Sequence, residues 1–228
     1  MVQDKKYDIR DDGRIVALRD IPRWHVKAGD LGGHVGGEDV LGQSGDAWVE
    51  PGGTVSATAS VGGDALIRGV VADCARVGGE AVVLPGATVC GYAIVHGTVD
   101  VCEGALVAGH VVLGGMVRVC PDARVHGFAM FGGAEIICSY ADVSHPDHVL
   151  SAQVVASSSF KANLCRTIDG HRLQVGCWDG TVEEFRMMIE SDEWVEADDA
   201  AIKRRRPEML AFASMCEARI ATWGGEEW

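Results

Sequence analysis

The sequence predicts a mainly β protein: a parallel β-solenoid of about six coils, flanked by an N-terminal cap and a small C-terminal α+β module. The first observation is an apolar residue at every sixth position from Val71 to Val155, fifteen positions in all. The second is a glycine, alanine or valine, most often alanine, two positions before each of them as far as Ala129. Helices repeat near every 3.6 residues and strands every two, so a period of six requires short strands separated by corners.

Residues two apart lie on the same side of a strand, so each small residue and the larger one after it fill one interior. Three edges of this kind close a triangular coil, and successive coils stack by parallel pairing at about 4.8 Å. The same step runs from Val49 to Ile67, and the register slips once, because Val71 follows Ile67 by only four residues. The last full coil is expected near Val143, with a partial coil to Val155 as an open alternative.

These patterns divide the chain into a cap at 1–46, a β-solenoid at 47–150 and a C-terminal module at 151–228. Caps are needed because an open coil presents unpaired backbone. The segment RIVALRDI at 14–21 predicts a strand of the N-terminal cap.

Turn and helix signals define the C-terminal module. Asp169-Gly170 between two alternating runs predicts a hairpin. Thr181, with Glu184 three residues later, predicts a capping box that starts a helix ending near Glu190. A second helix is expected from about Asp198 to Thr222, interrupted or re-entered at Pro207. Its predicted apolar side carries Phe212, Met215, Cys216 and Ile220.

Composition limits where the protein works. The charged start, MVQDKKYDIRDDGR, is unlike a signal peptide and no long apolar run occurs, so we expect a cytoplasmic protein with no membrane contact. The net charge of −13 disfavours nucleic acid as a partner. None of the eight cysteines forms a CxxC pair, which favours free thiols.

The segment 26–49, VKAGDLGGHVGGEDVLGQSGDAWV, resembles the amino-terminal signature of uncharacterised phage and prophage proteins with a left-handed, hexapeptide-repeat β-helix. In that family a strand, a DG turn and a glycine-cysteine-aromatic segment lead into a helix, as Asp169-Gly170 and Gly176-Cys177-Trp178 do here. The resemblance implies the left-handed sense of the coil, a viral origin with the host cytosol as location, and a homotrimer associated through flat faces. It implies no reaction.

Two histidines are candidates for catalysis. A coenzyme A-dependent acyltransferase of this fold needs one histidine as general base beside a groove for the cofactor. His96 and His126 each follow a core valine and can serve, although either is more often an exposed corner residue. They differ by 30 positions, which is no multiple of 18, so the repeat places them on different edges.

The sequence offers two candidates for a metal site. A zinc-dependent carbonic anhydrase of this fold needs three histidines, which His110, His145 and His148 approach only loosely. The other candidate is a column of thiols. Cys102, Cys120 and Cys138 recur every 18 residues, so they should stack on one corner of successive coils. No histidine or carboxylate completes a tetrahedral set, and we therefore predict no metal and no other cofactor.

Five residues are predicted to bind a ligand. Arg166, His171 and Trp178 lie on the predicted hairpin and offer a stacking surface beside a cation. Arg204 and Arg205 belong to the basic run 203–206, whose guanidinium groups suit phosphates. The alternative for this run is a set of cations at the end of a helix, where they complement its dipole.

The sequence favours a non-catalytic function. We expect a phage binding protein, a homotrimer that sequesters a small host ligand such as a nucleotide-type immune signal, or a host defence protein. The alternatives are the acyltransferase and a structural component of the virion.

Overall fold

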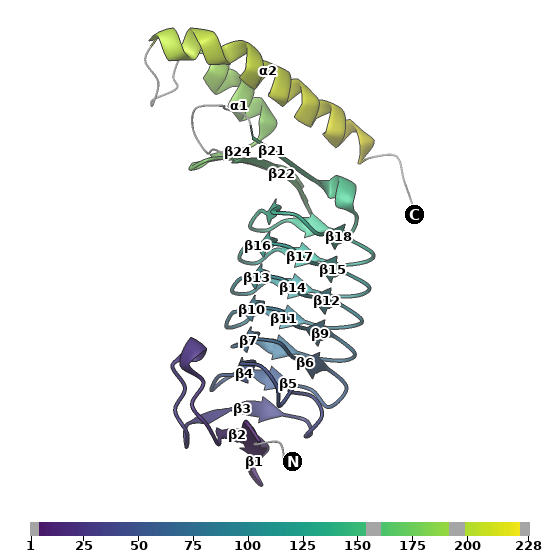
Figure 1. The fold of residues 1–228 in the computed structure, drawn as a ribbon. Helices are drawn as coiled ribbons and strands as arrows, with labels where there is room; N and C mark the ends of the chain where they lie inside the picture. Colours follow the sequence, from purple (N-terminus) through teal and green to yellow (C-terminus); the bar gives the residue numbers. More distant parts are fainter. Residues whose placement is uncertain (1–4, 154–160, 192–198, 224–228) are drawn as a thin grey trace.

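The computed structural model describes residues 5–153, 161–191 and 199–223, with side chains in the last range from residue 204 onward. Three walls of short parallel strands surround a triangular interior, and a separate antiparallel sheet with two helices follows at the C-terminal end (Figure 1). This architecture confirms the predicted fold class: a parallel β-solenoid of about six turns with a small α+β module.

Each wall is a ladder of strands, nearly all two residues long, that pair in parallel. The first wall contains β3 (Leu31–Val35), β5 (Thr54–Val55), β8 (Val70–Val71), β11 (Thr88–Val89), β14 (Leu106–Val107), β17 (Arg124–Val125) and β20 (Asp142–Val143). The second contains β6 (Ser60–Val61), β9 (Arg76–Val77), β12 (Ile94–Val95), β15 (Val112–Leu113) and β18 (Met130–Phe131). The third contains β4 (Trp48–Val49), β7 (Leu66–Ile67), β10 (Val82–Val83), β13 (Asp100–Val101), β16 (Arg118–Val119) and β19 (Ile136–Ile137).

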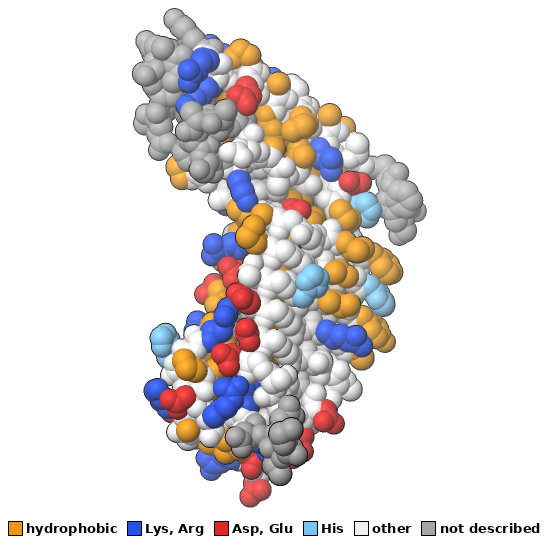
Figure 2. Space-filling view, viewed as in Figure 1, with side chains coloured by type: hydrophobic (Ala, Val, Ile, Leu, Met, Phe, Trp, Pro, Cys, Tyr) orange, Lys and Arg blue, Asp and Glu red, His pale blue; other side chains and the backbone are white. Residues whose placement is uncertain are grey.

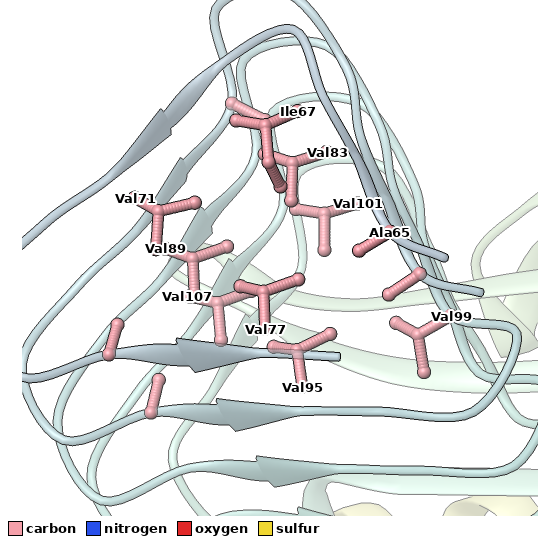
Figure 3. Packing of buried hydrophobic residues seen from close by; sticks show 14 of the residues in the cluster. Ala65, Ile67, Val71, Val77, Val83, Val89, Val95, Val99, Val101 and Val107 are labelled. Carbon is pink, nitrogen blue, oxygen red and sulfur yellow. The ribbon is translucent and has the colours of Figure 1, made fainter. Parts of the chain in front are cut away.

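The core is built as the six-residue period predicts. Val89 pairs with Val107 and Val107 with Val125, one coil further on each time. The second residue of each strand points inward, and Figure 3 shows the aliphatic side chains of the three walls converging on one interior. Every predicted apolar position from Val49 to Val149 is buried, and Val155 lies outside the described residues.

The single slip in the period is taken up at one corner. Val49 pairs with Ile67, whereas Ile67 pairs with Val83, so the later coil is two residues shorter. Gly69 turns this corner so closely that an added Cβ would lie 2.3 Å from the Ala87 carbonyl oxygen. The short coil therefore depends on glycine at this position.

Gly69→Ala is expected to lower the free energy of unfolding by about 1–3 kcal/mol, because the new methyl group meets backbone that cannot move away without distorting the coil. Guanidinium unfolding at a fixed protein concentration measures the change. Gly78→Ala is the matched control, since no atom lies within 4 Å of its added Cβ. Gly78→Ala should be neutral or slightly stabilising. A Gly69→Ala protein as stable as this control would contradict the explanation of the slip.

The N-terminal cap closes the first coil with an antiparallel hairpin, β1 (Tyr7–Ile9) and β2 (Arg14–Ala17), followed by the 3₁₀ turn η1 (Pro22–Trp24). Lys6 is buried, and its Nζ donates a hydrogen bond to the Ala47 carbonyl at 2.7 Å. Burial lowers the pKa of Lys6 to about 8. Parallel pairing begins at β3, so the first coil starts before the boundary predicted at residue 47.

The C-terminal module is a four-stranded antiparallel sheet covered by two helices (Figure 1). It consists of β21 (Val149–Gln153), β22 (Lys161–Thr167), β23 (Gly170–Val175), β24 (Trp178–Gly180), α1 (Val182–Glu190) and α2 (Asp199–Thr222), with the 3₁₀ turn η2 (Pro146–His148) before it. The predicted hairpin and the Thr181 capping box are confirmed. Because β21 pairs antiparallel with β22, the alternative of a further partial coil is wrong.

Helix α2 differs from prediction in two respects. It continues through Pro207 instead of stopping there. Met215 is exposed, whereas Met209 and Ala213 are buried with Phe212 and Cys216. Within the described ranges, no helix has the length and hydropathy needed to cross a membrane.

Candidate functional site

The candidate site is a cavity between the end of the solenoid and the C-terminal sheet. β22 packs against the last coil, where the backbone N–H of Cys138 donates to the Cys165 Sγ at 3.1 Å. Beside this contact lies a cavity of about 590 Å³, which we call the junction cavity. Its wall is formed by Tyr140, Thr167, Ile168, Asp169, His171, Arg172, Asp179, Gly180 and Thr181.

Tyr140 and Arg172 bring an aromatic ring and a cation together in this cavity. Tyr140 occupies a corner of the last coil with φ +61°, and its ring is largely exposed. The Arg172 guanidinium lies 5.9 Å from the centre of that ring, within cation–π range. Arg172 also forms an ion pair with Asp179 of β24. The cavity thus offers a stacking surface, a cation and carboxylates.

His171 connects the cavity to helix α1. Its Nε2 accepts a hydrogen bond from the Val182 N–H at 3.0 Å, at the first turn of the helix. Glu183 lies 3.3 Å from the same nitrogen. An accepting Nε2 leaves Nδ1 to carry the ring proton. His171 therefore fixes the start of α1 as well as lining the cavity.

Of the five predicted ligand-binding residues, His171 alone lines the cavity. Arg166 instead reaches the last coil, where its Nη1 lies 3.8 Å from Asp142 Oδ2. Trp178 is half-buried, with its ring 5.3 Å from that of Phe185, and packs against the core of the C-terminal module. Arg204 is exposed and Arg205 half-buried on α2.

The helix-end explanation for the basic run is wrong. Because α2 continues through Pro207 to Thr222, Arg204 and Arg205 lie in its first half. Cations near a helix N-terminus do not complement the dipole.

His126 belongs to a polar cluster on the first wall. Its Nε2 lies 3.3 Å from Asp142 Oδ1, and the other carboxylate oxygen faces Arg166. A carboxylate that orients an imidazole is the arrangement a general base requires. His96 follows β12 on the second wall, where its ring covers Gly114, so the two histidines lie on different walls as predicted.

His148 lies beside this cluster, where the C-terminal module is tied to the last coil. Its Nδ1 accepts a hydrogen bond from the Ser144 N–H at 3.2 Å. The Trp223 Nε1 donates to the Asp147 carbonyl at 2.9 Å, which fixes the end of α2 over this turn. Burial, reinforced by the Arg166 and His145 charges, lowers the pKa of His148 to about 4.

The pH dependence of stability should therefore include a contribution from His148. Between its ordinary pKa of 6.5 and about 4, the unfolded chain binds a proton that the folded protein excludes. Stability contributed by the neutral ring is complete above pH 6.5 and is lost as the pH falls through this window. His148→Asn keeps an acceptor for Ser144, so it should lose less stability than the wild type between pH 7 and 4, as measured by thermal unfolding. An unchanged slope would contradict this role, and His96→Asn is the control.

The cysteine column stacks as predicted. Cys102, Cys120 and Cys138 follow strands β13, β16 and β19, which pair in register on the third wall. Burial raises the pKa of the Cys120 thiol to about 11, which disfavours the thiolate that metals bind. In the part of the chain that the structure describes, no three histidine, cysteine or acidic side chains are placed to hold a metal ion.

The sequence analysis did not single out Tyr140, Arg172 and Asp179, which line the cavity. Strand alternation alone places Arg172 on the opposite face of the hairpin from His171. Nothing in the sequence indicates that this face turns toward Tyr140. Comparison of the chain with models of known protein families finds no match, and comparison with curated proteins finds none.

Proposed function

We propose that this chain is a non-catalytic phage protein that acts as a homotrimer in the host cytosol and sequesters a small, nucleotide-type host ligand, thereby countering host defence. The observation that carries the binding function is the junction cavity. Its volume of about 590 Å³ falls within the range of small-molecule sites, about 300–1,000 Å³. The phage origin and the trimer rest on the resemblance of residues 26–49 to phage β-helix proteins.

The residues around the cavity fit the three parts of a nucleotide. The exposed Tyr140 ring offers a face for a base, and stacking of this kind contributes about 1–3 kcal/mol per base. Asp169 accepts hydrogen bonds from ribose hydroxyls or exocyclic amines. Arg172 suits a phosphate, which would replace Asp179 as its partner.

The same geometry favours binding over catalysis. Among the residues that line the cavity, His171 is the only histidine, the side chain most often used as a general acid or base. Its Nε2 is already committed to the start of α1. Proton transfer through that nitrogen would disrupt the helix cap, whereas holding a ligand requires no change in the ring.

Titration calorimetry with AMP, ADP-ribose and cyclic di-AMP tests this proposal. At least one probe should bind with one site per chain, and Arg172→Gln should weaken that binding at least about tenfold, because a charged hydrogen bond is lost. Arg76→Gln, on an exposed strand of the second wall, is the matched control and should bind as the wild type does. No heat with any probe, or equal affinity for Arg172→Gln, would count against the cavity as the site.

Acyl transfer is a second candidate, favoured by the contact between His126 and Asp142. If it holds, coenzyme A binds the wild type, and acetyl transfer to an amine acceptor is abolished by His126→Asn but retained in His96→Asn. Acetyl-coenzyme A that remains intact with the wild type would exclude this candidate.

A further inference from the structure

The upper part of the second wall presents an exposed apolar face to solvent. Three consecutive coils contribute one corner residue and one strand residue each: Tyr92 and Ile94, His110 and Val112, Phe128 and Met130. We call these six residues the aromatic face. Tyr92 and Met130 are each 61% exposed and Phe128 is 72% exposed. Figure 2 shows the hydrophobic and histidine side chains gathered along this edge of the solenoid.

The corner residues of this face form an ordered stack. The His110 ring lies 4.9 Å from Tyr92 and 5.2 Å from Phe128, and both pairs are within 7° of parallel. The stack follows from the repeat, because residues 18 apart occupy the same corner of successive coils. The surface is therefore preorganised, which lowers the entropic cost of binding a partner.

Charge is missing from this face, although the chain carries a net −13. The segments 91–98, 109–116 and 127–134 contain no aspartate, glutamate, lysine or arginine. The equivalent segment one coil earlier, 73–80, contains Asp73, Arg76 and Glu80. The repeat thus tolerates charge at these outward positions, and its loss in three coils together is a local feature. Depletion of charge around exposed aromatic and methionine side chains is typical of protein interfaces.

We propose that the aromatic face binds a second copy of this chain and forms the contact of the homotrimer. This inference rests on the oligomer in the proposed function and adds the surface that makes it. Two features favour a second copy as the occupant. Each copy carries the same net negative charge, so copies repel one another where carboxylates face carboxylates. The aromatic face carries no carboxylate, so copies can meet there without this repulsion. Its outward side chains also repeat with the rung spacing of about 4.8 Å, so the faces of three copies can pack against one another around a three-fold axis, coil beside coil.

Light scattering coupled to size-exclusion chromatography of the full chain tests the surface. The wild type should elute with three times the 24.1 kDa mass of one chain, and Met130→Glu should elute as a folded monomer, because the substitution places a carboxylate in the contact. Met187→Glu is the matched control: Met187 is also 61% exposed but lies on α1, so this variant should stay trimeric. A monomeric wild type, or a Met130→Glu protein that keeps the wild-type mass, would overturn the inference.

Failure of the surface and failure of the ligand proposal can be told apart. The junction cavity is lined by residues of one chain, so monomeric Met130→Glu should bind the calorimetric probes as the wild type does. If Met130→Glu loses assembly but still binds a probe, the result shows that the aromatic face makes the trimer contact and that the cavity acts independently of it. A wild-type trimer that binds none of the probes would leave the proposal for the surface intact and contradict the proposal for the ligand. Circular dichroism of Met130→Glu confirms that the monomer is folded, since Met130 points outward and fills no part of the core.

Discussion

The narrow interior of the triangular coil is the constraint on which the rest of the structure depends. Three walls bring their side chains to one axis, so each strand has room for one inward apolar residue, most often valine, and each preceding corner for a glycine, alanine or valine. Val71, Val89 and Val107 from one wall meet Val77 and Val95 from another in this space (Figure 3). Outward residues are free of this constraint, and they carry whatever chemistry distinguishes one coil from the next.

The C-terminal sheet packs on the last coil of the solenoid, and the candidate site forms where the two meet. Tyr140 comes from the last corner of the solenoid, whereas Arg172 and Asp179 come from the hairpin. The buried contact between Cys138 and Cys165, and the bond from Trp223 to Asp147, hold the two parts together. A cavity assembled from two packed units in this way is shaped before a ligand arrives, which suits tight binding of a small molecule.

Much of the fold follows from the sequence, because its rules are local or periodic. The spacing of Val89 and Val107 predicted their pairing, and Thr181 with Glu184 predicted the start of α1. Helix α2 is different: it continues through Pro207, and the buried Met209 and Phe212 fix the part of the helix that follows the proline, so tertiary packing overrides the local signal for a break.

The candidate site was predicted only in part, because tertiary packing and not a local pattern brings its residues together. His171 was identified from the hairpin, but Tyr140 belongs to a corner that sequence reasoning treated as scaffold. Arg166, predicted to bind a ligand, lies beside Asp142 and is not among the residues that line the cavity. Each of these outcomes depends on the angle at which the C-terminal sheet meets the last coil, and no periodicity encodes that angle.

The central claim is that the solenoid holds a ligand without transforming it. The most direct measurement is to incubate the protein with cyclic di-AMP and ADP-ribose, remove the unbound nucleotide, denature the complex by heat, and analyse the released small molecule by mass spectrometry. The account predicts recovery of the same nucleotide, intact and in an amount close to one per chain. A hydrolysed or acylated product, or no recovered nucleotide at all, would contradict it.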